Sequence, residues 1–109
     1  MNNNLLHETY STLCRMGLVT SGNDFSRRML GRSARLYSWI KATDHPPALD
    51  VLLGLYARLD DLHDEAHAKG DAITARTLDD LAGRLWTMIR EESLTRGPNR
   101  RNKASKLAG

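Results

Sequence analysis

The sequence has a single cysteine among its 109 residues and lacks a long uninterrupted apolar run. One thiol, Cys14, excludes an intrachain disulfide and suits a reducing compartment. No apolar stretch approaches the ~18 residues that a membrane-spanning helix needs. The N-terminal residues lack the positive segment and apolar core of a secretory signal. These absences predict a soluble, cytoplasmic protein that does not enter a membrane.

Motifs of catalysis are missing as well. The chain has no nucleophile elbow, no dinucleotide-binding glycine fingerprint and no glycine-rich phosphate loop. His63 and His67 stand four residues apart on a predicted helix, so both rings could point toward one zinc ion. No CxxC pair or further histidine cluster supplies the other ligands that a stable zinc site needs. We therefore expect no enzymatic activity, no metal and no cofactor.

The length and the charge distribution point to one domain with several different surfaces. A chain of 109 residues can bury one helical core but is too short for two domains. The net charge of +3 is unevenly placed: residues 27–41 carry five positive side chains and no acid. Residues 49–93 hold ten acids against five bases, and the segment after Leu94 is basic without an acid. Such blocks predict different partners for different parts of the chain.

The spacing of apolar residues predicts an all-α fold of five helices and no strand. Asn4 is a suitable N-cap for the first helix, which Gly17 would end. Ser21 and Asp24 form a capping-box pattern at the start of the second helix, and Gly31 interrupts that helix.

The third predicted helix is short and has one apolar face. Ser33 is expected to cap it, and its inward residues by spacing are Leu36 or Tyr37, together with Ile40. Trp39 is expected to be partly buried in the core, the alternative being an exposed ring.

Two longer helices follow the Pro46–Pro47 pair and form an antiparallel hairpin over about residues 47–95, joined by a turn at Gly70. The predicted inward residues are Leu49, Leu52, Leu53, Tyr56, Leu59 and Leu62 in the first, and Ile73, Leu78, Leu81, Ala82, Leu85, Trp86, Met88 and Ile89 in the second. This stripe either fills an internal core or also forms a homodimer interface. Residues 1–95 are thus a single helical domain, and residues 96–109 are a disordered basic tail.

Residues 21–42 combine features of a DNA-binding helix-turn-helix: a short Gly31-Arg32-Ser33 turn, apolar residues that fix a helix crossing, and basic residues that face outward. The next helix reads Pro47-Ala48-Leu49-Asp50-Val51-Leu52-Leu53-Gly54-Leu55. The stretch from Ser21 to Leu59 resembles the lambda repressor and Cro-like helix-turn-helix family. It departs from that pattern at Arg32, where an apolar residue is usual. The second helix is also one residue longer, with Ser26 or Arg27 at the crossing.

The resemblance implies a transcriptional regulator that binds double-stranded DNA. Four residues would face base edges: Arg32, Ser33, Arg35 and Ser38. Three would contact phosphates: Arg27, Arg28 and Lys41. Arginine can bind guanine in a bidentate way, and phosphate contacts make affinity depend on salt. Two alternatives stay open: the arginines form a solvated basic face, or the chain is a protein-interaction module that keeps the helix-turn-helix fold without binding DNA.

Overall fold

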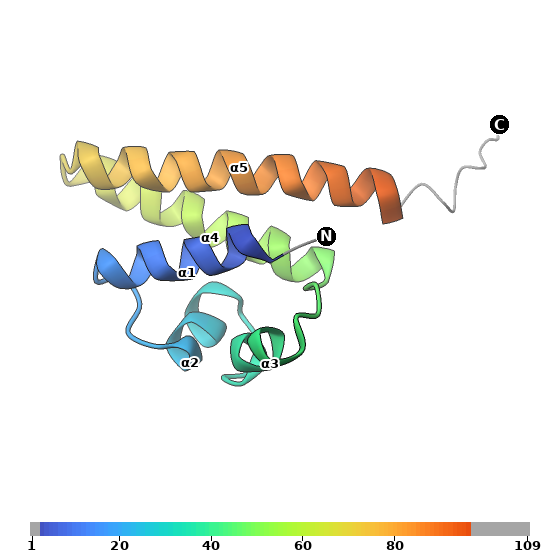
Figure 1. Cartoon of the computed structure of the whole chain (residues 1–109). Helices are drawn as coiled ribbons and strands as arrows, with labels where there is room; N and C mark the ends of the chain where they lie inside the picture. The colour runs from blue at the N-terminus through green and yellow to red at the C-terminus, as the bar shows by residue number, and fades with distance from the viewer. Residues whose placement is uncertain (1–2, 97–109) are drawn as a thin grey trace, which may run out of the picture.

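The computed structural model describes residues 3–96 (Figure 1). Its helical segments are α1 (Asn4–Arg15), α2 (Gly22–Asp24), η1 (Phe25–Met29), α3 (Leu36–Thr43), α4 (Leu49–Ala68) and α5 (Ala72–Arg96). Since η1 continues α2 directly, residues 3–96 form five helical units without a strand, and the all-α prediction is confirmed. Helix α5 runs to Arg96, one residue beyond the predicted domain end. The rest of the predicted basic tail lies outside the described residues.

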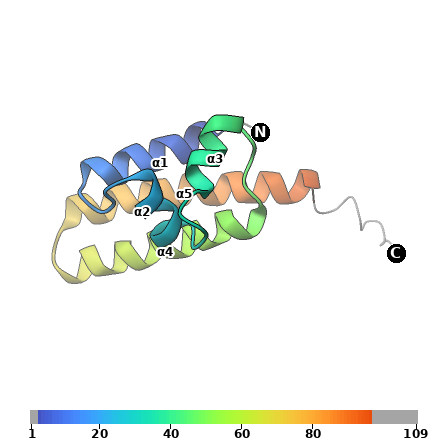
Figure 2. The same cartoon turned by 90° about the horizontal axis from the view of Figure 1, so that it is seen from below.

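Helices α4 and α5 are the longest elements, and they run antiparallel side by side (Figures 1 and 2). The turn between them contains Gly70 at φ 79°, a conformation that favours glycine. The short helices α2 and α3 lie on the opposite side of α1 and α4 from α5 (Figure 1). In the described part of the chain, no helix has both the length and the apolarity to cross a membrane.

The core draws side chains from every helical unit except the short α2. On α4 the buried line consists of Val51, Leu52, Leu55, Leu59 and Ala66. On α5 it consists of Ala75, Leu78, Leu81, Ala82, Leu85 and Ile89. Three predicted inward residues are wrong: Leu53 is 46% exposed, Ile73 is 81% exposed and Trp86 is 44% exposed. The apolar stripe of the hairpin is wider than the surface that the N-terminal helices cover, so its margins face outward.

One of the predicted helix caps is confirmed, and two are wrong. Asp24 donates its backbone N–H to the Ser21 hydroxyl at 3.1 Å, which confirms the predicted cap of the second helix. Asn4 is already helical, so the predicted cap of α1 was one residue late. Ser33 does not cap α3, which begins at Leu36 after two further residues of turn. Another residue supplies that cap.

Ser26 caps α3 from the neighbouring helix. Its hydroxyl accepts the backbone N–H of Tyr37 at 2.8 Å and donates to the carbonyl of Gly22 at 2.9 Å. Tyr37 is the second residue of α3, where N–H groups have no partner inside the helix. Ser26 is fully buried, and a Cβ on Gly22 would lie only 3.4 Å from the Tyr37 ring. Small residues at both positions therefore let the two helices cross closely.

The segment η1 is a π-helical turn, which takes up one more residue per turn than an α-helix. The N–H of Leu30 bonds to the carbonyl of Phe25, five residues back, at 3.1 Å. The N–H of Arg32 reaches the carbonyl of Ser26, six residues back, at 3.1 Å. This wider turn keeps both Phe25 and Met29 buried.

We expect Ser26→Ala to lower the free energy of unfolding by about 1–3 kcal/mol, because the buried N–H of Tyr37 loses its acceptor. Urea denaturation followed by circular dichroism measures the change. Thr87→Ala is the matched control, since the Thr87 hydroxyl also donates to a carbonyl four residues back, at 3.2 Å, but on an exposed surface. It should change stability by no more than about 0.5 kcal/mol. Equal losses in the two variants would contradict the capping role.

Candidate nucleic-acid interface

The outer face of α3 is exposed and positively charged. Arg35, Ser38 and Lys41 are exposed, whereas Tyr37 and Ile40 on the opposite side are buried. No acidic residue occurs between Arg27 and Thr43 in the sequence. Viewed from below, α3 lies in front of α5, with no other helix covering it (Figure 2). An anionic partner can therefore approach this face directly.

An aromatic cluster holds α3 against α1. The Tyr37 ring packs against Tyr10 and Phe25, with centroids 4.7 and 5.0 Å away. Its hydroxyl lies 2.9 Å from Nδ1 of His7. Burial raises the pKa of Tyr37 to about 12, so the phenol stays neutral at physiological pH. The outer face of α3 thus rests on a rigid, uncharged support.

Three of the predicted contact residues have guanidinium or ammonium groups without an acidic partner in the described part of the chain. Arg27 and Arg35 are both exposed, and neither forms an ion pair with any residue between positions 3 and 96. The ammonium of Lys41 lies 5.7 Å from the centroid of the Tyr37 ring, within cation–π range. These cations are available to phosphate or base oxygens without first breaking an ion pair.

The other two predicted arginines are paired. Arg28 Nη1 lies 3.2 Å from Asp24 Oδ2, and Arg32 Nη2 lies 2.5 Å from Asp50 Oδ2 in the first turn of α4. The Arg32 side chain is 46% exposed and that of Asp50 is 69% exposed. Exposed pairs of this kind contribute at most about 1 kcal/mol, so a phosphate can compete with either carboxylate.

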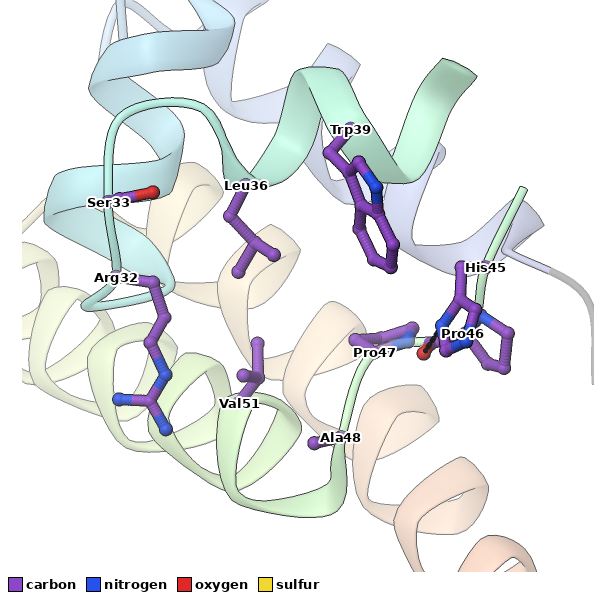
Figure 3. A pocket seen from close by; sticks show the side chains of 9 residues that line it. All are labelled: Arg32, Ser33, Leu36, Trp39, His45, Pro46, Pro47, Ala48 and Val51. Atoms are coloured by element: carbon purple, nitrogen blue, oxygen red, sulfur yellow. Dashed lines mark hydrogen bonds between the residues drawn. The ribbon is translucent and has the colours of Figure 1, made fainter. Parts of the chain in front are cut away.

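Arg32 and Ser33 lie on a different side of the turn from the outer face of α3. Both line an apolar pocket of about 460 Å³ between α3, the loop after it and the start of α4 (Figure 3). No pattern in the sequence predicted this pocket. Its other lining residues are Leu36, Trp39, His45, Pro46, Pro47, Ala48 and Val51. The structure therefore divides the predicted base-contacting residues into an outer pair, Arg35 and Ser38, and a pocket pair.

Trp39 forms one wall of the pocket. Its ring is 47% exposed and lies 4.9 Å, centroid to centroid, from the ring of His45. The predicted partial burial of Trp39 in the core is wrong, because the ring packs on the loop after α3 and leaves nearly half of its surface exposed. The signal in the sequence was the His45-Pro46-Pro47 segment, whose stiff backbone brings His45 back toward α3.

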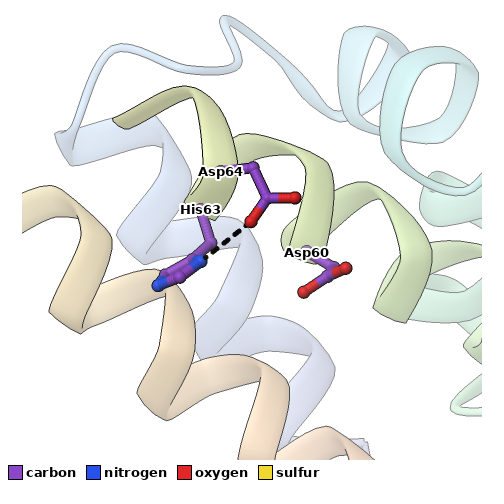
Figure 4. A group of neighbouring side chains, drawn as sticks. All are labelled: Asp60, His63 and Asp64. Atoms are coloured by element: carbon purple, nitrogen blue, oxygen red, sulfur yellow. Dashed lines mark hydrogen bonds and ion pairs between the residues drawn. The ribbon is translucent and has the colours of Figure 1, made fainter. Parts of the chain in front are cut away.

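One group of metal-binding side chains occurs in the part that the structure describes. Ligand atoms of Asp60, His63 and Asp64 lie within 4.8 Å of one another on α4 (Figure 4). The rings of His63 and His67, the pair considered from the sequence, have centroids 6.2 Å apart. Asp60 and Asp64 are exposed and all three residues belong to one helix, whereas structural zinc sites use four protein ligands. This group alone supports no proposal.

Comparison with known proteins adds a family but no activity. A family described as a family of unknown function (DUF6626) matches residues 6–103. No significant match to a curated protein or to a solved structure was found.

Proposed function

The chain belongs to this family of unknown function, DUF6626, and we propose that it binds double-stranded DNA as a transcriptional regulator. The proposed helix-turn-helix consists of α2, η1 and α3, with α3 as the recognition helix. One observation carries the proposal: the outer face of α3 is exposed, free of acids and held at a close crossing by the Ser26 hydroxyl. A recognition helix in the major groove needs such an open face on a rigid support.

Contacts to base edges and to phosphates are expected from different side chains. Arg35 directly precedes α3 and Ser38 lies on its outer face, which would enter the groove, and arginine is suited to bidentate binding of guanine. Arg27 on η1 and Lys41 on α3 are exposed, and we assign both to phosphates. Arg28, Arg32 and Ser33 are secondary candidates. The two arginines would first have to leave Asp24 and Asp50.

The main test is Arg35→Ala. Loss of one bidentate arginine–guanine contact costs about 1–3 kcal/mol, so affinity for the preferred duplex should fall roughly 5- to 150-fold. In vitro selection from a random duplex library identifies that duplex, and a fluorescence anisotropy titration at fixed salt measures the affinity.

Arg76→Ala is the matched control for this test. Arg76 is an exposed arginine on α5 with no ion pair in the described part of the chain, so its loss removes the same charge away from α3. We expect little change in affinity. If selection enriches no sequence, or if the two variants lose affinity equally, the DNA-binding proposal is wrong.

A second prediction concerns the pair between Arg32 and Asp50. Asp50→Asn should release Arg32 and raise DNA affinity by up to about fivefold, which corresponds to the strength of an exposed ion pair. Asp61→Asn is the control, because it removes an equal charge from an exposed pair on the same helix, with Arg58 at 3.1 Å. Equal increases in both variants would mean that only net charge changed and that Arg32 does not contact DNA.

The pocket favours a second candidate function, a protein-interaction module that keeps the fold without binding DNA. Its walls are mostly apolar, and the half-exposed Trp39 offers an aromatic surface of the kind enriched at protein interfaces. This candidate predicts that selection enriches no duplex and that Arg35→Ala leaves the weak binding to random DNA unchanged. The same titration therefore separates the two functions.

A further inference from the structure

An exposed apolar surface crosses the hairpin of α4 and α5. It consists of the exposed Leu53 and the half-buried Tyr56 on α4 and the exposed Trp86 on α5, and we refer to these three residues as the hairpin patch. Leu53 is 46% exposed, Trp86 is 44% exposed, and the rings of Tyr56 and Trp86 lie 5.4 Å apart, centroid to centroid. Large apolar side chains grouped on a surface indicate an interaction site more than isolated ones do.

The hairpin patch lies on a different side of the hairpin from its contacts with α1 and η1. On α5, Arg84 binds Glu8 of α1 with two bonds of 2.6 and 2.7 Å, and it lies about 200° around the helix from Trp86. On α4, Arg58 donates to the carbonyl of Arg28 in η1 and lies about 140° around from Leu53. A partner on the patch would therefore leave both α1 and the outer face of α3 uncovered.

Charges of opposite sign flank the patch along α5. Asp79 precedes Trp86 by seven residues and Arg90 follows it by four, which places them about 10 Å and about 6 Å away along the helix. Asp60, four residues after Tyr56 on α4, adds to the acidic end near the Gly70 turn. Asp79 and Arg90 are exposed, and neither forms an ion pair within residues 3–96. Trp86 thus lies between Asp79 and Arg90, about 2 Å from their midpoint on the Arg90 side.

We propose that the hairpin patch is the interface of a two-fold symmetric homodimer in which the two hairpins pack antiparallel. A surface with Asp79 at one end, an apolar centre and Arg90 at the other is complementary to its own reversed copy, since Glu91 and Glu92 lie about 140° and 240° around α5 from Trp86. Two-fold symmetry brings Arg90 of each copy opposite Asp79 of the other, and it places Trp86 and Tyr56 near the axis. A parallel arrangement would set like charges against each other. This inference does not depend on DNA binding.

The first test is the mass of the full chain without DNA, measured by light scattering and sedimentation at micromolar concentration. We expect twice the chain mass of 12.2 kDa. Trp86→Glu should give a monomer, because it places two charges at the apolar centre of the dimer. Ile73→Glu is the matched control: it puts the same charge at an 81% exposed apolar position of α5 outside the patch, and it should stay dimeric. Circular dichroism verifies that both variants are folded.

The second test reverses the flanking charges. Arg90→Glu or Asp79→Arg alone should raise the dimer Kd roughly tenfold, because each breaks two symmetry-related exposed pairs. The double variant should recover most of the loss. A monomeric wild-type chain, or a dimer that survives Trp86→Glu, would overturn the interface. A double variant no tighter than the single ones would overturn the antiparallel arrangement.

Discussion

The hydrogen bond from the Tyr37 N–H to the Ser26 hydroxyl is the contact on which the N-terminal half of the fold depends. It joins Ser26 of the second helical unit to the first turn of α3 across 2.8 Å, in a fully buried position. Because α3 has no capping side chain of its own, its start is defined by a neighbour and not by the residues before it. The direction of the basic face therefore follows from a crossing that two small residues, Gly22 and Ser26, make possible.

The sequence predicted the elements better than their outer surfaces. The spacing of apolar residues and the positions of the turn glycines predicted the five helical units. Gly31 and Gly70 adopt the positive φ angles that such turns require. The same periodicity placed Leu53 and Trp86 in the core. An apolar stripe shows which residues avoid water, but the number of neighbouring helices decides how wide a stripe is covered. That number is a property of the tertiary arrangement, and no local pattern contains it.

At the candidate site, the sequence likewise predicted where the charged residues occur but not which of them form ion pairs. Sequence identified the acid-free segment between Arg27 and Lys41, and the structure leaves Arg27 and Arg35 without acidic partners in the described residues. It did not anticipate that Arg32 meets Asp50, eighteen residues later. The start of α4 returns to the turn only after the loop around Pro46 and Pro47 has reversed the chain. Pairing between distant charges thus depends on loop geometry that composition does not encode.

The π-helical turn makes the length of the second helical unit as important as its composition. One residue added to or removed from a helix rotates everything after it by about 100° and shifts it by about 1.5 Å along the axis. A shorter, purely α-helical version of this unit could keep Phe25 and Ser26 in place. It would then turn Leu30 out of the core and redirect the chain at Gly31. A chain with this unit shortened by one residue would therefore present its third helix with a different rotation, and its outward side chains would not correspond position by position to those of α3.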